Sequence, residues 1–355
     1  MHGFRARLSN AAPLAGNAAA GLLTALPFLD GRLFFCAYPG LILFLALRFA
    51  DGGRRFGRCY LYAFCFHLPL YSFFVNLYPF EGFGLSQSAA VAVTILAVVG
   101  IPAVHALFFS AVFVLLRFVR RPALLPLCAG ALWVIFEWTL SLGTLAFPWG
   151  TLAAGQYLFL PAIQSASLLG SYFVTMVIVT GCGYLALFVR RPAQKRLLAA
   201  GCGILAGNIA LGALLLALPA GETDTVRAAV VQGNIGTSEK WESGRAAEIL
   251  ALYASLAEQA AQAGAELILL PETAVPVYFE EGGVLHQAYA RIAAEYGCTI
   301  ATGVLVRDGD VGRNALLAVY PDGSISERYD KRHLVPFGEY LPFESLLKKL
   351  LPFLE

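Results

Sequence analysis

Long apolar runs fill the first 219 residues, and short segments that carry arginine, proline or glycine separate them. A helix needs about 20 apolar residues to cross the hydrocarbon core of a bilayer. Seven runs meet this requirement, so the pattern predicts seven membrane-spanning helices, at residues 11–29, 31–50, 57–78, 88–118, 123–142, 161–189 and 197–218. The fourth run contains Gly100 and Pro102, and we expect it to be tilted or kinked.

From Thr225 onward the pattern changes to short apolar strands that alternate with helices. Residues 239–263 carry apolar side chains at a spacing of three and four, including Ile249 and Leu252, which predicts an amphipathic helix. A second helix is expected at 284–296. Strands are expected at residues 226–231, 267–270, 299–306 and 315–320. Alternation of strands and helices favours an α/β layered domain.

Composition supports a division into a transmembrane domain, residues 1–219, and an aqueous domain, residues 220–355. Only 14% of the residues are charged, against about 25% in ordinary soluble domains. The first part holds 14 Lys and Arg and 4 Asp and Glu, a net charge of +10, whereas the second holds 11 and 19, a net charge of −8. The basic residues of the first part lie in short loops between spans, which is typical of membrane topology and not of nucleic-acid binding.

The loop charges also predict the orientation in the membrane. Loops on one side of the predicted spans carry 13 Lys and Arg, whereas Arg32 is the only basic residue in the loops on the other side. The positive-inside rule then places the N-terminus in the cytoplasm. Seven spans would place the acidic domain on the outer, extracytoplasmic side.

Three features of the transmembrane domain stay open on the sequence alone. Glu137 lies inside the fifth predicted span, where an ionisable residue indicates either a function or a buried pairing. The outer loop 143–161 contains Phe147 and Trp149, and it is either an interfacial aromatic belt or a loop that contacts lipid headgroups. Glu81 lies in another outer loop, which is either functional or a simple turn.

Cysteine usage predicts neither a disulfide framework nor a metal site. Six of the seven cysteines lie in apolar segments, where cysteine is an ordinary buried residue. The sequence has no CxxC motif and no His/Cys spacing typical of metal ligands, so we expect no metal and no cofactor. Cys298 is the only cysteine of the acidic domain.

Candidate chemistry is concentrated at two places in the acidic domain, Glu272 and the segment 329–342. Glu272 follows an apolar strand and a proline, where partial desolvation would suit a general base. Its alternative is an exposed carboxylate at a strand end. Lys331 is suited to stabilise an oxyanion that develops on a carbonyl group, or it is an ordinary solvated lysine. A glutamate and a lysine together lack a nucleophile, which covalent chemistry at a carbonyl takes most often from cysteine or serine.

Three motifs of the acidic domain resemble the nitrilase, or carbon–nitrogen hydrolase, superfamily: Pro271-Glu272-Thr273, Asp330-Lys331 and the run 335–339. That resemblance implies an αββα sandwich and a Glu-Lys-Cys triad. The seven preceding spans, the loop Phe147-Pro148-Trp149 and the pair Lys240-Trp241 narrow it to the apolipoprotein N-acyltransferases of the bacterial inner membrane. The resemblance extends over nearly the whole chain.

An activity and its residues are implied by this resemblance. An acyl chain passes from a phospholipid to an enzyme cysteine as a thioester, and then to the N-terminal diacylglyceryl-cysteine of a lipoprotein. Glu272 is implied as the general base, Lys331 as the stabiliser of the tetrahedral intermediate, and Glu339 as a supporting glutamate. Three aromatic residues are implied to bind substrate: Trp241, Trp149 and Tyr340.

One part of the family pattern has no counterpart in the sequence. In the family, the nucleophilic cysteine follows the lysine by a few tens of residues and precedes a last transmembrane span. The sequence ends at Glu355, 24 residues after Lys331, and contains neither. Cys298 precedes Lys331 and is expected to be a buried structural thiol. We therefore expect a C-terminally truncated enzyme, with an incomplete α/β domain, that is inactive as it stands.

Two other functions stay open on the sequence. One is a membrane-tethered amidase or nitrilase that uses water in place of the amine acceptor, although such an enzyme needs neither the loop 147–149 nor seven spans. Release of free acid or ammonia would indicate it. The other is a non-catalytic membrane protein that binds lipid or lipoprotein, and stable expression of a gene that stops after Glu355 would favour it.

Overall fold

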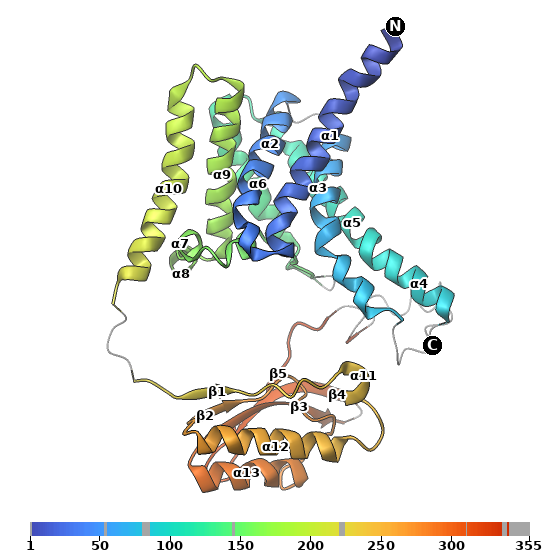
Figure 1. Cartoon of the computed structure of the whole chain (residues 1–355), viewed down its shortest axis with the longest axis vertical. Helices are drawn as coiled ribbons and strands as arrows, with labels where there is room; N and C mark the ends of the chain where they lie inside the picture. Colours follow the sequence, from blue (N-terminus) through green and yellow to red (C-terminus); the bar gives the residue numbers. More distant parts are fainter. Residues whose placement is uncertain are drawn as a thin grey trace. The chain divides into compact units, whose positions relative to one another are not determined.

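The computed structural model describes residues 2–52, 55–79, 86–143, 146–219, 224–309, 311–335 and 339–340. Glu81, whose role the sequence leaves open, lies outside these residues. The chain divides into two compact units, Met1–Pro219 and Ala220–Glu355. The first unit is helical, and the second is built on a β-sheet that helices cover (Figure 1).

Apolar helices make up the first unit. Its α-helices are α1 His2–Leu29, α2 Ala37–Ala50, α3 Phe56–Leu70, α4 Gln87–Ile95, α5 Ile101–Phe113, α6 Leu125–Thr139, α7 Leu160–Ile163, α8 Ala166–Leu169, α9 Ser171–Arg190 and α10 Lys195–Ala217. Short 3₁₀ and π segments connect or extend them: η1 Gly31–Cys36, η2 Ser72–Leu77, η3 Leu96–Gly100, η4 Val114–Phe118, η5 Pro122–Leu124 and η6 Ala154–Gln156. Among the described residues, six stretches are long and apolar enough to cross a membrane: Ala12–Leu29, Gly31–Ala50, Gln87–Phe118, Pro122–Thr139, Ser171–Arg190 and Lys195–Ala217.

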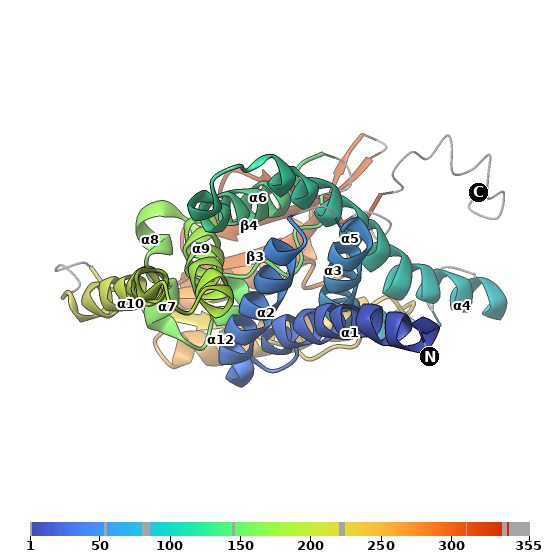
Figure 2. The same cartoon turned by 90° about the horizontal axis from the view of Figure 1, so that it is seen from above.

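The multi-span bundle is therefore confirmed, but the third predicted span is not one of these long helices. Residues 57–78 form the 15-residue helix α3 followed by η2. Pro69 has no N–H to donate, which weakens the last turn of α3, and the helix ends at Leu70. α3 still packs along α1 and α5 inside the bundle, and Figure 2 shows it beside both.

The sixth predicted span is shorter than expected, because α9 begins at Ser171 and not near residue 161. Residues 160–169 form the short helices α7 and α8, and Gly170 interrupts the helical path with a φ of 80°. The kink expected in the fourth span takes the form of the π-helical segment η3, which ends directly before α5 and Pro102. Proline cannot donate the hydrogen bond that would continue a regular helix.

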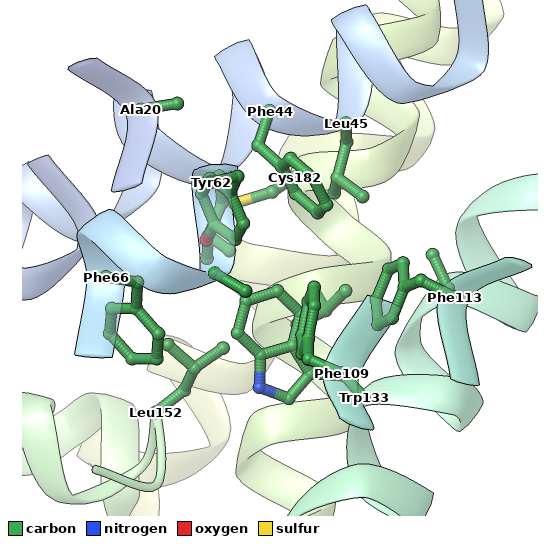
Figure 3. Close-up of a cluster of buried hydrophobic side chains, with 14 of the residues drawn as sticks. Ala20, Phe44, Leu45, Tyr62, Phe66, Phe109, Phe113, Trp133, Leu152 and Cys182 are labelled. Carbon is green, nitrogen blue, oxygen red and sulfur yellow. The ribbon is translucent and has the colours of Figure 1, made fainter. Parts of the chain in front are cut away.

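Aromatic rings from four helices fill the centre of the first unit (Figure 3). Phe44 of α2 stacks on Tyr62 of α3 with 3.7 Å between ring centroids, and Trp133 of α6 meets Phe109 of α5 edge to face at 4.9 Å. Helix association in lipid depends on such packing, because lipid tails are as apolar as the side chains. Gly21 of α1 allows close approach to α3, since a Cβ there would lie 2.3 Å from the carbonyl oxygen of Tyr62.

The described residues of the second unit form a five-stranded mixed sheet in the order β1-β2-β3-β4-β5. The strands are β1 Ala228–Val230, β2 Leu267–Leu269, β3 Thr299–Asp308, β4 Val311–Val319 and β5 Tyr329–Asp330. β1, β2 and β3 run parallel, whereas β4 and β5 are antiparallel to their neighbours. The α/β class predicted from the sequence is confirmed.

Two helices cover one face of this sheet. The helices of the second unit are α11 Thr237–Lys240, α12 Ala246–Gln262 and α13 Val284–Tyr296. α12 and α13 lie side by side against the strands (Figure 1), and Ile249 and Tyr289 are buried between helices and sheet. α12 begins later than the predicted start at residue 239, because Gly244 adopts a φ of 88° that interrupts the helix. The described part of the unit thus contains one helical layer and one sheet of the expected αββα sandwich.

Candidate active site

Glu272 stands in a turn directly after strand β2. Pro271 ends the strand because it has no N–H for the ladder, and Thr273 adopts a φ of 46° in the left-handed region. The turn lies against Gly303 of β3, which donates its N–H to the Pro271 carbonyl at 3.3 Å and accepts from the Ala274 N–H at 3.1 Å. A Cβ at position 303 would lie 2.6 Å from the Glu272 Cα. The close approach of a strand glycine therefore fixes the direction in which Glu272 projects.

Lys331 follows the short strand β5 at the edge of the sheet. Its N–H donates to the carbonyl oxygen of Asn314 on β4 at 2.8 Å and so extends the β4–β5 ladder. Its Nζ reaches Oε1 of Glu272 at 2.9 Å. The fold therefore brings together the two residues that the sequence singles out, across 59 positions of chain.

Glu339 completes this ion cluster. Its Oε1 accepts a hydrogen bond from Lys331 Nζ at 2.7 Å, and its Oε2 accepts one from the Val335 N–H at 2.8 Å. The second bond ties Glu339 to the main chain of the segment that follows Lys331. The ammonium group thus bridges two carboxylates, each through one oxygen.

Asn314 is a site residue that the sequence reasoning missed. Its Nδ2 donates to Oε1 of Glu272 and, at 3.4 Å, to Oε1 of Glu339. An amide in this position supplies hydrogen bonds to both carboxylates without adding a charge. The signal in the sequence was a single amide directly before the apolar run 315–319 of a strand, because a polar group at such a position requires a partner.

The three charged side chains differ in exposure. Glu272 is 59% exposed, so it lacks the desolvation that the sequence suggests, whereas Lys331 and Glu339 are 27% and 26% exposed. Partial burial lowers the pKa of Lys331, but its hydrogen bonds to Glu339 and Glu272 outweigh burial and raise the pKa above its ordinary value. Burial likewise raises the pKa of Glu339, but the hydrogen bonds from Lys331 and the Val335 N–H hold it below its ordinary value. Lys331 and Glu339 therefore both carry their charges at neutral pH.

Lys240 brings the segment after β1 to the same turn. Its Nζ donates to the main-chain carbonyl oxygen of Glu272 at 3.3 Å. Partial burial lowers the pKa of Lys240, and the charge of Glu272 opposes this effect. Trp241 follows directly and is 57% exposed. This predicted substrate residue is therefore adjacent in sequence to a lysine that contacts the site, as Tyr340 is adjacent to Glu339.

Trp149, the third aromatic residue predicted to bind substrate, belongs to the first unit. Its ring stacks on Phe147 with 5.7 Å between centroids and lies 5.2 Å from the ring of Phe73 in η2. Trp149 is 49% exposed. Both interpretations of this loop, an aromatic belt and a headgroup loop, require an aromatic residue on the surface.

Cys298 does not belong to the ion cluster. It lies directly before β3, is 1% exposed and packs in the apolar core of the second unit. Burial raises the pKa of its thiol, which disfavours the reactive thiolate. These surroundings agree with the structural thiol expected from the sequence.

The cluster combines an exposed carboxylate with an ammonium group that two further side chains hold in place. The carboxylate is able to accept a proton from a nucleophile, and the ammonium is able to stabilise negative charge on a carbonyl oxygen. Covalent chemistry at an ester or amide requires a nucleophile in addition. The arrangement therefore suits acyl transfer in combination with such a group.

Two known families match the chain, and the matches together extend over most of it. The family described as "Apolipoprotein N-acyltransferase N-terminal domain" matches residues 20–184. The family described as "Carbon-nitrogen hydrolase" matches residues 227–355. The first match falls in the helical unit, and the second falls in the unit that contains the ion cluster.

Curated relatives named "Apolipoprotein N-acyltransferase" are similar to the chain. One from Allorhizobium ampelinum is 32% identical over 267 residues, which cover 72% of this chain and 50% of the relative. One from Geobacter metallireducens is 32% identical over 234 residues, which cover 62% and 44%. One from Pseudomonas syringae pv. tomato is 29% identical over 329 residues, which cover 88% and 62%. The chain thus spans about half the length of the curated relatives it matches.

Proposed function

Because this chain belongs to the apolipoprotein N-acyltransferase family, within the carbon–nitrogen hydrolase superfamily, we propose that it takes part in the N-acylation of bacterial lipoproteins. The acyl donor is a membrane phospholipid. The acceptor is the α-amino group of the N-terminal diacylglyceryl-cysteine of a lipoprotein. The observation that carries this proposal is the Lys331 ammonium, which lies between the carboxylates of Glu272 and Glu339 at 2.9 and 2.7 Å.

The first half-reaction forms a thioester. The nucleophile of this proposal is a cysteine that is missing from the 355 residues, as expected from the sequence. Glu272 accepts the proton of its thiol while the sulfur attacks the ester carbonyl of the phospholipid. Lys331 stabilises the negative charge on the carbonyl oxygen of the tetrahedral intermediate. The carbon–oxygen bond then breaks, the glycerol oxygen takes the proton from Glu272, and a lysophospholipid leaves. Cys298 is not this nucleophile, because it is 1% exposed in the core.

The second half-reaction transfers the acyl group to the amine. The neutral α-amino group attacks the thioester and gives a proton to Glu272, and Lys331 again stabilises the oxyanion. The carbon–sulfur bond breaks, and the leaving sulfur takes the proton from Glu272, which restores the cysteine thiol and the Glu272 carboxylate. Glu339 and Asn314 hold Lys331 and Glu272 in place through the hydrogen bonds described above. The substrates are held by three aromatic residues: Trp241, Tyr340 and Trp149.

The two ends of the helical unit differ in chemistry, which supports an orientation in the membrane. At one end, Arg48 Nη2 donates to the Phe113 carbonyl at 3.0 Å and Arg190 Nη1 donates to the Ala46 carbonyl at 3.1 Å, so α2, α5 and α9 all end there. Arg58 of α3 pairs with Asp51 at the end of α2. The positive-inside rule assigns this arginine-rich end to the cytoplasm.

The opposite end of the bundle is aromatic. α3 begins at the arginine-rich end, where its Arg58 pairs with Asp51. In η2, which follows α3, the ring of Phe73 contacts the ring of Trp149 at the aromatic end. α3 and η2 together therefore run from one end of the bundle to the other. Counting this segment with the six long helices gives seven crossings. The N-terminus then lies in the cytoplasm of a bacterial inner membrane, and the unit that contains Glu272 and Lys331 lies in the periplasm, where lipoprotein acceptors emerge.

Reconstitution tests this function. The protein isolated from its native membrane is placed in vesicles of phosphatidylethanolamine with a labelled acyl chain, and a peptide with an N-terminal diacylglyceryl-cysteine is added. We expect label on the peptide amino group and an equal amount of lysophospholipid. Glu272→Gln should abolish both products, whereas Glu295→Gln, at an exposed residue of α13, should abolish neither. Label released as free fatty acid, or lipid binding without turnover, would contradict the proposal.

A further inference from the structure

Glu137 is a carboxylate of the first unit that the proposed reaction does not use. It lies in helix α6 and is 2% exposed. Its Oε1 accepts from the Leu152 N–H at 2.8 Å and from Trp133 Nε1 at 3.1 Å, and its Oε2 accepts from Thr175 Oγ1 at 2.9 Å. The donors belong to α6 itself, to α9 and to the segment 146–157. Glu137 therefore ties that segment to two helices of the bundle.

All three partners of Glu137 are neutral. The ion pairs among the described residues of the first unit join Asp30 with Arg32 and Asp51 with Arg58, and neither involves Glu137. A neutral amide satisfies the same partners, because its oxygen accepts two N–H bonds and its NH₂ group donates to the Thr175 hydroxyl. The geometry of this side chain thus accounts for its contacts without a charge.

The segment that Glu137 holds has a base buried in the bundle. Leu152 packs in the aromatic core beside Trp133 (Figure 3). Gln156 is 1% exposed, and its Oε1 accepts from the Tyr38 hydroxyl at 3.0 Å while its Nε2 donates to the Phe34 carbonyl at 3.2 Å. Hydrogen bonds at Leu152 and Gln156 therefore fix the segment at two points.

The tip of the same segment is exposed and aromatic. Trp149 is three residues before Leu152, and half of it is accessible. Gly150 connects the tip to the base with a φ of 86°, and a Cβ there would lie 2.2 Å from Cδ2 of Leu70 on α3. The close packing of Gly150 against Leu70 restricts the conformation of the chain between the fixed main chain at Leu152 and the indole of Trp149.

We propose that Glu137 is a positioning residue that fixes Trp149 against the acyl chains of the phospholipid donor. It acts through the geometry of its hydrogen bonds and not through a charge. The inference rests on the proposed function, since it assigns the segment 146–157 to the donor. It extends that function by naming the buried group on which the surface tryptophan depends.

Two substitutions separate geometry from charge. Glu137→Gln removes the charge and keeps the length, whereas Glu137→Asp keeps the charge and withdraws the carboxylate from the Leu152 N–H by one methylene. The reporter is the fluorescence of Trp149 in vesicles of phosphatidylethanolamine with brominated acyl chains. Subtraction of the signal of Trp149→Phe in each background isolates Trp149 from the other tryptophans.

We expect Glu137→Gln to keep the Trp149-specific quenching and Glu137→Asp to lose it. In the transfer assay, Glu137→Asp should raise the KM for phospholipid about tenfold with a smaller change in kcat, because a tryptophan that binds the donor is displaced. Asn208→Ala is the matched control. Asn208 is a buried polar residue of α10 that bonds to Ser165 and the Ala162 carbonyl, and neither partner belongs to the segment 146–157.

Equal quenching in Glu137→Asp and the unsubstituted protein would overturn the positioning role. Loss of quenching in Glu137→Gln with retention in Glu137→Asp would overturn the claim that geometry and not charge is required. Loss of quenching in Asn208→Ala would show that the effect is not specific to Glu137. The quenching comparison does not depend on turnover. Absence of acyl transfer from the unsubstituted protein would therefore contradict the proposed function, while the role of Glu137 would still be decided by quenching.

Discussion

Glu137 and Glu272 are two glutamates held by hydrogen bonds in opposite surroundings. Glu137 is 2% exposed and accepts only from neutral donors, an indole, a main-chain N–H and a hydroxyl. The side chain of Glu272 is 59% exposed and accepts from the Lys331 ammonium and the Asn314 amide. A charge is costly to bury in a membrane protein and is easily kept where water has access. In the proposals above, Glu137 therefore acts through the geometry of its hydrogen bonds, and Glu272 acts through its charge.

The largest effect that would test this contrast is expected at Lys331. Lys331→Met removes the cation and leaves the carboxylates of Glu272 and Glu339 facing each other without compensation. Acyl transfer should fall by about 10²–10³-fold, which is typical for loss of an oxyanion-stabilising group. The measurement is the rate of labelled peptide formation.

The neighbour Arg332 offers a matched control for this substitution. Its guanidinium lies over the ring of Tyr329, with 5.8 Å to the ring centroid, and takes no part in the ion cluster. Arg332→Met should change the rate by less than about threefold, as expected for a surface position. Equal losses in the two variants would show that net charge, and not the ammonium between two glutamates, is what the reaction needs.

A smaller effect on the rate of acyl transfer is expected from substitution of Asn314. This residue sharpens the comparison of the two glutamates, because it supports Glu272 with hydrogen bonds and without a charge. Asn314→Ala removes one donor from each carboxylate and leaves the ion pairs with Lys331 in place. The rate should fall about tenfold, in the range observed when groups that orient a catalytic residue are lost. Arg313→Ala is the control, because Arg313 precedes Asn314 on the strand, faces the other side and pairs with Asp308 at 3.2 Å. An unchanged rate in Asn314→Ala would mean that Lys331 alone orients Glu272.

The smallest effect is expected in the pH dependence of stability around β4 and β5. The lowered pKa of Glu339 contributes stability that is present above pH 4.5 and is lost as the pH falls through the pKa of the folded state. The raised pKa of Lys331 contributes stability that is present below pH 10.5 and is lost as the pH rises through its folded pKa. Each contribution is about 1 kcal/mol or less, as for other partly exposed ion pairs.

Hydrogen exchange of the β4 amides measures this contribution, after correction for the intrinsic effect of pH on exchange. The local stability of β4 should decrease when the pH is lowered below 4.5. Glu339→Gln should remove that decrease, because a neutral amide does not titrate in this range. An identical pH response in the two proteins would argue that Glu339 does not stabilise the strand.

Much of the fold followed from periodicity, and the exceptions have local causes. The helix expected at 284–296 is α13, Val284–Tyr296, because its apolar positions recur with the helical period and Gly297 ends it in the left-handed region. The helix expected at 239–263 starts late because Gly244 adopts a positive φ. The helix of the third span is short because Pro69 lacks an N–H. Hydrophobicity records neither effect. Apolar periodicity predicts where a helix gains burial, but not where its backbone is interrupted.

The residues of the candidate site likewise divide into those that the sequence identified and those that it did not. Glu272 was identified as a charge after an apolar strand, and Lys331 as a cation able to stabilise an oxyanion. The fold brings their side chains to 2.9 Å. Asn314 was missed because an amide has neither a charge nor a fixed motif, and its meaning depends on the two carboxylates that β2 and the segment after β5 bring to it. The sequence left the exposure of Glu272 open between partial desolvation and an exposed strand end, since strand hydrophobicity describes the residues before the turn and not the solvent beyond it.

Gly303 has a consequence for the comparison of related sequences. Because Gly303 has no side chain, the turn 271–274 packs directly against the backbone of β3. A methyl group at position 303 would therefore displace Glu272 and not β3. A search for functional positions that considers only reactive side chains would pass over it. In a related chain that retains the glutamate and the lysine, a larger residue at the position of Gly303 would mark a protein that folds with its glutamate displaced from its lysine.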